Sequence, residues 1–471
     1  MNVKSILKNT IKKGPVKTYQ IYKKRKEEKA EELRKIELKR EEKAKKLRKI
    51  QLKQDVIEKI AEGSFDDARE VLGEYLKMIS SKKDITEKLY NKHLRSIYIK
   101  DVYPKVYQAA AVRPVENKVI FMEREGAHYL SWKYMYDYLK VNSSYELKVH
   151  YLGLRDVSNE QYYENAKEYL KDAATAKAVF VCSADDLMGH LTLRPETTYI
   201  QLWHGCGVFK KIGLSTADKK FGRSAAMHKE YPLNTNYSYV TIASPELSWI
   251  FEESMNIKKD SGIIKPVGVS RTDIFFDPAY IKNCYEKLYK KIPQSKNKKI
   301  ILYAPTFRGK VSDASAPDKL DIEKFAQKLG DEYILVCKHH QLVKQMPEIP
   351  EKYKNTFAFD LSADSDMNIN DLMIVSDICI SDYSSVVFEY SLMERPMIFF
   401  VYDLEEYIDE RGLYYNLDEI TPGPLFKTND EIIDYIQHID EKFDKQVVID
   451  FKNRFMCCCD GHSSERIASL I

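Results

Sequence analysis

The fold class follows from one stretch, Ile378-Cys379-Ile380-Ser381-Asp382-Tyr383-Ser384-Ser385-Val386-Val387-Phe388-Glu389. An apolar run of strand length stops at a short polar turn, and a helical pattern begins directly after it. Backbone N–H groups at such a helix start, together with the hydroxyls of Ser384 and Ser385, form a cradle for an anion. Ordinary N-capping by serine or aspartate explains the same residues equally well, so both interpretations stay open.

Similar apolar runs recur along the chain and alternate with helical patterns. The first series is 118–122, 146–152, 178–182, 199–202 and 239–243, and the second is 263–266, 299–303, 333–337, 355–360, 378–381 and 397–401. Strands at this spacing predict parallel sheets with helices on both faces. We therefore predict an α/β chain of two doubly wound, Rossmann-like domains at 116–261 and 262–471. Ligands should bind at the carboxyl ends of the strands, in the crevice between the domains.

Composition narrows the class of protein. The 471 residues are 44% hydrophobic and 31% charged, which excludes wholesale disorder. No apolar run reaches the ~18 residues of a membrane span, and the first residues lack the apolar core of a signal peptide. The eight cysteines form no CxxC pair and indicate reduced thiols. We therefore expect a cytoplasmic protein.

The N-terminal end of the chain is strongly basic. Residues 1–54 hold 20 Lys and Arg against 7 Asp and Glu, whereas the remaining residues carry a net negative charge. Segment 27–39 recurs as 41–53, and this offset of two heptads returns five apolar residues to one side of a helix: Leu33, Ile36, Leu47, Ile50 and Ile57. We predict a basic helical or coiled-coil arm at 1–62 and a helical linker region at 63–115.

Three interpretations of the arm stay open. A helix with this many charges is typical of a solvated, ion-paired face or a loose coiled coil. Leu and Ile on one face with Lys and Arg around them also suit adhesion to an anionic membrane surface. Nucleic acid is the weakest alternative, because no base-reading motif or aromatic interleaving accompanies the charge.

A histidine stands where another predicted strand ends. The segment Tyr199-Ile200-Gln201-Leu202-Trp203-His204-Gly205-Cys206-Gly207 carries His204 into a turn bracketed by two glycines, which let a ligand approach the backbone. A neutral imidazole at that position can remove a proton from an attacking hydroxyl. A histidine that caps its own turn is the alternative.

Two further strand ends carry residues suited to phosphate. The strand 299–303 breaks at Pro305 and delivers Thr306 and Arg308 to the sheet edge, where a hydroxyl and a guanidinium fit phosphate oxygens, although a surface salt bridge is an equal alternative. The run Val336-Cys337-Lys338-His339-His340 ends another strand, and alternation predicts that one histidine faces the crevice while the other turns away. A two-histidine zinc site has no evident acidic third ligand, so we expect no metal.

Together these segments resemble the CDP-glycerol glycerophosphotransferase family, the teichoic acid primases and polymerases of Gram-positive cell walls. The resemblance runs in one collinear order over about residues 116–471 and leaves the arm outside. It is carried by Gln201-Leu202-Trp203-His204-Gly205, Lys210-Lys211-Ile212-Gly213, Leu302-Tyr303-Ala304-Pro305-Thr306-Phe307-Arg308, Ser381-Asp382-Tyr383-Ser384-Ser385, Arg395-Pro396-Met397-Ile398-Phe399-Phe400-Val401-Tyr402-Asp403, Arg411-Gly412-Leu413-Tyr414-Tyr415 and the Asp460-Gly461…Arg466 segment.

The resemblance implies a glycosyltransferase-B-like fold with an acceptor domain at 116–261 and a CDP-polyol-binding domain at 262–471. It implies transfer of glycerol phosphate or ribitol phosphate from CDP-glycerol or CDP-ribitol to a lipid-linked, undecaprenyl-type acceptor, with release of CMP. The product would belong to teichoic acid or a related cell-wall or capsule polymer. No cofactor besides the donor substrate is expected.

The resemblance also assigns roles to single residues. His204 is expected to be the base for the acceptor hydroxyl, and His339 is expected to act at the donor pyrophosphate, with His340 as the fallback. The predicted substrate-binding residues are Thr306, Arg308, Asp382, Ser384, Ser385, Asp460 and Arg466.

Two positions depart from the family pattern. The family commonly continues Trp-His-Gly with Thr-Pro, whereas this chain has Cys206-Gly207, which puts the acceptor side in question. Glu389 stands where aspartate is more usual. Neither change removes a residue expected to take part in catalysis.

A lipid-linked acceptor gives the basic arm a natural partner, because the inner leaflet is anionic. We predict a peripheral protein on the inner face of the cell membrane, attached through the arm, with self-association through the arm as a further expectation and no nucleic acid partner. The alternatives are a sugar-nucleotide glycosyltransferase of cell-surface polysaccharide with the same fold, and a non-catalytic, membrane-associated scaffold.

Overall fold

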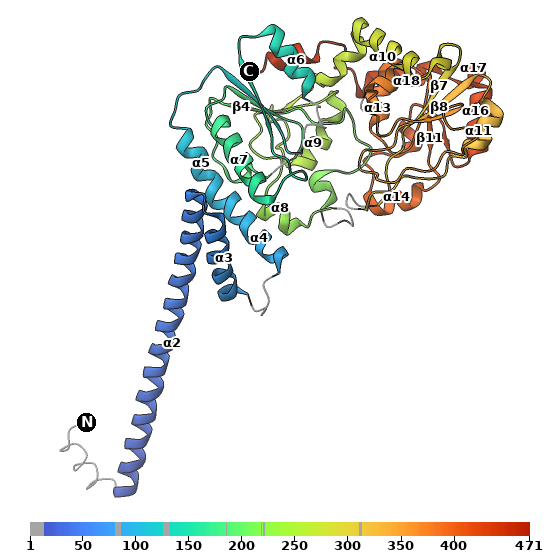
Figure 1. Cartoon of the computed structure of the whole chain (residues 1–471). Helices are drawn as coiled ribbons and strands as arrows, with labels where there is room; N and C mark the ends of the chain where they lie inside the picture. Colours follow the sequence, from blue (N-terminus) through green and yellow to red (C-terminus); the bar gives the residue numbers. More distant parts are fainter. Residues whose placement is uncertain are drawn as a thin grey trace. The chain divides into compact units, whose positions relative to one another are not determined.

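The computed structural model describes residues 14–80, 86–125, 132–184, 186–217, 219, 222–309, 313–364 and 366–471 (Figure 1). The first thirteen residues of the predicted arm and residues 81–85 of the predicted linker region lie outside this description. The chain divides into two compact units between Val102 and Tyr103. Among the described helices, none is both long and apolar enough to cross a membrane.

The first unit is helical. It contains α2 (Pro15–Glu62), α3 (Phe65–Ile79), α4 (Glu87–Ile97) and a short π-helical turn, η1 (Tyr98–Val102). Helix α2 ends at Gly63, whose φ of 79° lets its N–H reach back to the carbonyl of Ile60. Helix α3 turns back and packs along α2 (Figure 1), burying apolar side chains of both helices: Leu52, Val56, Ile60, Leu72 and Leu76.

The repeated apolar residues of α2 divide into two groups. Ile57 is buried, at 8% exposure, within the stretch that lies along α3. Leu33, Ile36, Leu47 and Ile50 are 43–60% exposed. The repeat therefore leaves a line of exposed apolar side chains among the Lys, Arg and Glu residues of the helix.

The second unit begins with α5 (Tyr103–Ala110) and contains two lobes, each built on a parallel six-stranded sheet. In the N-lobe the strand order is β2-β1-β3-β4-β5-β6, and every pair is parallel. The strands are β1 (Lys118–Glu123), β2 (Glu146–Tyr151), β3 (Ala178–Val181), β4 (Thr198–Gln201), β5 (Tyr239–Thr241) and β6 (Ile264–Lys265). The accompanying helices are α6 (Lys133–Asn142), α7 (Asn159–Ala173), α8 (Ala225–Glu230) and α9 (Ser248–Met255), with the 3-10 turns η2 (Met188–His190), η3 (Gly213–Thr216), η4 (Pro245–Leu247) and η5 (Ser270–Phe276).

The C-lobe has the strand order β12-β11-β10-β7-β8-β9, again parallel throughout. Its strands are β7 (Lys299–Tyr303), β8 (Tyr333–Cys337), β9 (Ala358–Asp360), β10 (Ile378–Ser381), β11 (Met397–Phe400) and β12 (Leu425–Phe426). Its helices are α10 (Pro278–Lys291), α11 (Ile322–Leu329), α12 (Ile369–Val375), α13 (Val386–Tyr390), α14 (Leu404–Arg411), α15 (Leu417–Ile420), α16 (Asn429–Gln437), α17 (Ile439–Lys442) and α18 (Lys445–Phe455), with η6 (Pro293–Lys296) and η8 (Ser391–Met393).

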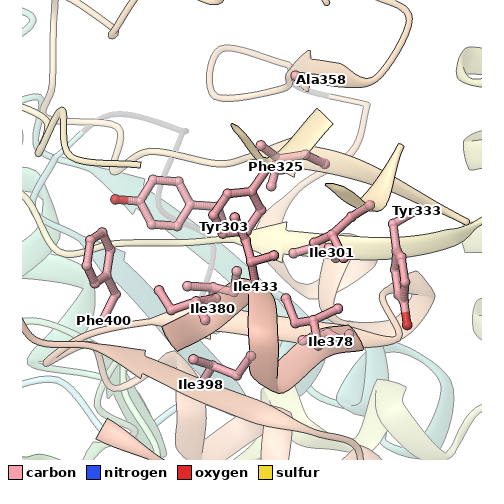
Figure 2. Close-up of a cluster of buried hydrophobic side chains, with 14 of the residues drawn as sticks. Ile301, Tyr303, Phe325, Tyr333, Ala358, Ile378, Ile380, Ile398, Phe400 and Ile433 are labelled. Carbon is pink, nitrogen blue, oxygen red and sulfur yellow. The ribbon is translucent and has the colours of Figure 1, made fainter. Parts of the chain in front are cut away.

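Buried parallel strands explain why the sequence shows continuous apolar runs instead of alternation. In the C-lobe, Ile301, Tyr303, Ile378, Ile380 and Ile398 from three neighbouring strands point into one core, which Phe325 of α11 and Ile433 of α16 complete (Figure 2). The last helix, α19 (Ser463–Ala468), belongs to the N-lobe core, where Ile467 packs with Phe121 and Trp132. The two parallel sheets confirm the predicted α/β fold class.

The C-lobe strand order reverses between β7 and β10. These strands are neighbours in the sheet although about 75 residues separate them in the chain, and their carboxyl ends therefore open onto the same point. In doubly wound folds this switch point is where ligands bind. The segment after β7 carries Thr306 and Arg308, and the segment after β10 carries Asp382, Ser384 and Ser385.

Candidate active site

His204 lies just beyond β4, the strand next to β3 in the N-lobe sheet. Its Nδ1 donates a hydrogen bond to the carbonyl of Cys182, which follows β3, at 3.0 Å. In the neutral ring this bond leaves the lone pair on Nε2. The side chain is solvent-accessible but closely surrounded by protein, and this desolvation lowers its pKa below the usual 6.5. The imidazole is therefore neutral at pH 7 and presents a basic nitrogen.

The backbone before His204 is strained. Trp203 has a φ of 59°, a left-handed conformation that a bulky side chain rarely adopts and that costs about 1–3 kcal/mol. Gln201 stabilises it, because its Oε1 accepts the Trp203 N–H at 2.9 Å while its amide donates to the hydroxyl of Tyr237 at 2.9 Å. The Trp203 ring lies against the imidazole, with centroids 4.5 Å apart. The fold thus holds His204 in a defined orientation.

Asp382 ties the two strand ends of the C-lobe switch point together. Its buried carboxylate accepts the backbone N–H groups of Thr306 at 2.9 Å and Tyr383 at 2.6 Å. It also accepts a hydrogen bond from Nη1 of Arg308 at 2.9 Å. Asp382 is thus occupied in shaping the loop.

Arg308 is likewise engaged within the protein. Its guanidinium donates to both carboxylate oxygens of Asp403, at 2.6 and 3.1 Å, to Asp382, and to the carbonyl of Thr306 at 2.6 Å. Its guanidinium carbon lies 5.4 Å from the ring centroids of Tyr383 and Tyr407. Four of the five N–H donors therefore bind oxygens of the protein, and the hydroxyl of Tyr402 is a further hydrogen-bond partner of the guanidinium.

The two serines at the turn differ in what they bind. The hydroxyl of Ser384 accepts the N–H of Val386 at 3.4 Å, a local turn contact. The hydroxyl of Ser385, the residue before α13, caps nothing and has no hydrogen-bond partner among the described residues. A Cβ placed on Gly205 would lie 3.5 Å from Oγ of Ser385. The backbone next to His204 therefore meets this serine directly.

Residues 205–212, which we call the strap, follow His204 in the N-lobe and pack against the C-lobe. Its Lys211 N–H donates to the carbonyl of Gly412, and the N–H of Tyr414 donates to the carbonyl of Phe209. Gly207 sits against the ring of Phe388 so closely that no Cβ fits between them. Phe209 inserts among aromatic residues of the C-lobe, with its centroid 4.7 Å from that of Phe388. These contacts hold the segment that directly follows His204 against the C-lobe.

The two adjacent histidines point in different directions. His339 is 6% exposed and lies edge-on to Tyr303, beside a cavity of about 20 Å³ that Asp318 and Asp360 also line. That volume holds about one water molecule. His340 is exposed and its ring centroid lies 5.0 Å from that of Phe307. Its pKa falls to about 4, because of burial first and then the nearby charges of Lys210 and His204.

Asp460 and Arg466 bind each other and the nearby backbone. Arg466 donates to both carboxylate oxygens of Asp460, at 2.8 and 3.1 Å, to the carbonyl of Val267 at 3.0 Å, and to the carbonyl of Cys458. This clamp holds the start of α19 against the segment after β6. Within the described residues, no hydrogen bond or ion pair connects either side chain to Arg308 or Ser385.

Sequence reasoning missed Arg271, in η5. Its guanidinium forms an ion pair with Glu389, which is fully buried in α13, and its charge lowers the pKa of His204. No sequence pattern predicts a role for Arg271, because His204 and Glu389, the residues it interacts with, lie in different lobes. Lys210 lies in the motif Lys210-Lys211-Ile212-Gly213, for which the sequence predicted no role. In the structure its Nζ lies 3.5 Å from Oγ1 of Thr306. The described part of the chain holds no group of three or more His, Cys, Asp or Glu arranged for a metal ion.

The sequence of the two lobes matches a known protein family. The family described as CDP-glycerol:poly(glycerophosphate) glycerophosphotransferase matches residues 105–471. The chain belongs to this family. The resemblance expected from the sequence is therefore confirmed, and the match covers both lobes while leaving helix α2 outside.

Similar proteins of this family act in teichoic acid synthesis. The teichoic acid poly(ribitol-phosphate) polymerase of Bacillus spizizenii is 37% identical over 300 residues, which is 63% of this chain and 47% of that protein. The teichoic acid poly(glycerol phosphate) polymerase of the same organism is 29% identical over 393 residues, 79% of this chain and 96% of that protein. The chain thus spans about half the length of the first of these relatives.

A solved structure supports the fold. The wall teichoic acid polymerase TagF superposes with a TM-score of 0.64 at 23% identity, covering 82% of this chain and 97% of that one. At this identity the likeness concerns the fold alone. It agrees with the predicted glycosyltransferase-B-like arrangement of two Rossmann-like lobes.

Proposed function

We propose that this chain transfers glycerol phosphate or ribitol phosphate from CDP-glycerol or CDP-ribitol to a hydroxyl of a lipid-linked acceptor and releases CMP. One observation carries the proposal: Gly205, the residue directly after the neutral His204 of the N-lobe, lies against Ser385 at the C-lobe switch point. A base that takes the hydroxyl proton and donors that bind the phosphate oxygens both favour phosphoryl transfer to a hydroxyl, and the two lobes supply a candidate for each. Membership of the family and the names of the relatives support this reaction class.

In the proposed reaction the acceptor oxygen attacks the β-phosphorus of the donor. Nε2 of His204 takes the hydroxyl proton as the new oxygen–phosphorus bond forms. The bond from that phosphorus to the bridging oxygen breaks, and CMP leaves with the electron pair. The charge that develops on the diphosphate needs hydrogen-bond donors, and the hydroxyl of Ser385, which has no partner among the described residues, supports binding at this turn.

The geometry favours His340 over His339 as the second histidine of the site. His340 is exposed, and its pKa responds to both Lys210 and His204, whereas the ring of His339 faces a cavity that holds about one water molecule. Because burial and these neighbours hold the pKa of His340 near 4, it is neutral at pH 7 and can donate a hydrogen bond without adding charge. We assign His339 a packing role against Tyr303.

The roles of Arg308, Asp382, Asp460 and Arg466 follow from their partners. Arg308 and Asp382 fix the shape of the phosphate-binding turn and contribute to donor binding mainly by positioning Thr306 and Tyr383. Asp460 and Arg466 hold α19 in place. Their contribution to the donor site is then indirect.

We further propose that α2 attaches the protein to the inner face of an anionic membrane. Its exposed Leu33, Ile36, Leu47 and Ile50 lie among 20 Lys and Arg of residues 1–54, a combination that suits an interfacial helix. Each Lys or Arg near an anionic surface contributes about 1 kcal/mol. The same exposed residues, spaced by two heptads, support self-association as a second use of the helix.

Vesicle flotation tests the attachment. Full-length protein should float with vesicles containing anionic lipid, release in high salt, and stay unbound with neutral vesicles. A variant with Leu33, Ile36, Leu47 and Ile50 changed to serine keeps the charge and should bind several-fold more weakly. Equal flotation of this variant and the parent would show that charge alone, or another part of the chain, makes the contact.

Product analysis tests the reaction itself. Purified protein is incubated with CDP-glycerol, CDP-ribitol or a UDP-sugar in the presence of a lipid-linked acceptor, and nucleotide release and acceptor mass are measured. We expect CMP release with a mass gain of one or more polyol phosphates, and about 10²–10⁴-fold less turnover in His204→Ala. Release of UDP, or full activity of His204→Ala, would refute the proposal.

A further inference from the structure

Lys210 belongs to the N-lobe strap but contacts the segment that follows β7 in the C-lobe. Its backbone forms an antiparallel bridge with Leu413, and Nζ lies 3.5 Å from Oγ1 of Thr306. The neighbouring backbone bonds, from Lys211 to Gly412 and from Tyr414 to Phe209, hold the strap in this register. A cation from one lobe is thus presented at the strand end of the other.

Lys210 differs from Arg308 because its positive charge forms no ion pair within the described residues. Arg308 is paired with two carboxylates, Asp382 and Asp403, so its positive charge is already balanced. Lys210 has no carboxylate within ion-pairing distance among the described residues, and its one hydrogen bond goes to a hydroxyl. Burying a charged lysine without a carboxylate partner costs free energy of desolvation. A bound anion would pair with the ammonium and offset this cost.

The groups around Lys210 come from four segments of the C-lobe. They are Arg308 and Thr306 after β7, His340 after β8, Asp382 after β10, and Arg411 at the end of α14. Burial lowers the pKa of Lys210 to about 8; Asp382 opposes this shift, and Arg411 and Arg308 add to it. Asp382, the carboxylate that opposes the shift, is itself paired with Arg308, so it does not form an ion pair with Lys210.

We propose that Lys210 is the principal cation that binds the diphosphate of the cytidine donor, and that it does so across the two lobes. This inference rests on the proposed function and names the side chain that neutralises the phosphate oxygens as CMP leaves. An ammonium on the strap can meet the same phosphate that Thr306 and Ser385 face from the C-lobe. Donor binding then pairs the ammonium of Lys210 with an anion and holds the strap, which directly follows His204, against the C-lobe.

The test compares Lys210→Met, Lys210→Arg and Lys211→Met, the last being the next lysine on the same strap. Binding of CDP-glycerol and of CDP-ribitol is measured by isothermal titration calorimetry at pH 6.5, 7.5 and 9. Lys210→Met should bind about 10- to 100-fold more weakly at pH 6.5, the loss of one charge-assisted hydrogen bond, whereas Lys211→Met should match the parent. The unfolding midpoint in urea is recorded for each variant, as a check that the lobes still dock.

The pH series separates charge from packing. In the parent, protonated Lys210 binds the donor fully below its pKa, and affinity should fall as pH rises through about 8. Lys210→Arg stays charged, so its affinity should be independent of pH over this range, and Lys210→Met should be equally flat but weak. A Lys210→Met affinity equal to that of the parent, or an alkaline loss unchanged in Lys210→Arg, would overturn the assignment. A parent that binds neither CDP-glycerol nor CDP-ribitol would overturn the proposed function and this inference with it.

Discussion

Replacing Gly207 with alanine tests how the lobes are held together. The new Cβ would lie closer than 3.0 Å to three ring atoms of Phe388: Cγ, Cδ1 and Cε1. Restoring a normal carbon contact of about 3.5 Å needs a shift of about 1 Å. The ring is fully buried and packs against Phe209 and Phe451, with centroids 4.7 and 5.1 Å away, so it has little room to move.

Two costs follow from this overpacking. The free energy of unfolding should fall by about 1–3 kcal/mol, as for other insertions into a packed core. If the strap moves instead of the ring, His204 moves with it, and a displacement of about 1 Å can lower turnover by about 10²-fold. Urea denaturation measures the first effect and CMP release the second.

A matched control and a rescue make the prediction specific. Gly205→Ala changes a glycine of the same strap whose added Cβ would meet Oγ of Ser385 at 3.5 Å, an ordinary contact, so its stability should stay within about 0.5 kcal/mol of the parent. Combining Gly207→Ala with Phe388→Leu makes room for the methyl group and should give a coupling energy of about 0.5–3 kcal/mol. Additive losses in the double variant, or a parent-like Gly207→Ala, would refute the packing account.

Two further predictions concern residues whose partners lie inside the protein. Asp382→Asn leaves Arg308 short of a buried carboxylate, and the free energy of unfolding should fall by about 3 kcal/mol in urea denaturation; an unchanged midpoint would contradict the tie between β7 and β10. Arg466→Ala removes a partly exposed clamp and should cost about 1–2 kcal/mol while leaving CDP-glycerol affinity within twofold, as titration calorimetry would show. A large loss of donor affinity in a folded Arg466→Ala would instead place that side chain in the donor site.

The architecture could be predicted from the sequence because its strands are buried on both faces. Runs such as 299–303 and 378–381 are apolar at nearly every position, and the structure has strands at both. Strand β12 went unpredicted, because its two residues, between Pro424 and Lys427, are too few to form a pattern.

The site could be predicted only to the level of strand ends. Alternation implies that His339 and His340 diverge, but which of them faces outward depends on the packing of Tyr303 and Phe307. The partners of Arg308 lie 74 and 95 residues further along the chain, so nothing local shows that two carboxylates occupy it. The role of Arg271 is equally hidden in the sequence, because its ion-pair partner Glu389 lies in the other lobe.

The pH dependence of the chemical step, measured in single turnovers with bound CDP-glycerol, tests most directly whether His204 is the base. Because desolvation lowers the pKa of His204, the parent rate should fall in acid, with a midpoint below that of an ordinary histidine, as the ring takes a proton and loses its lone pair. The residual rate of His204→Gln should show no such acidic fall, at unchanged donor affinity. An acidic fall that persists in His204→Gln, or a rate equal to that of the parent, would contradict the account.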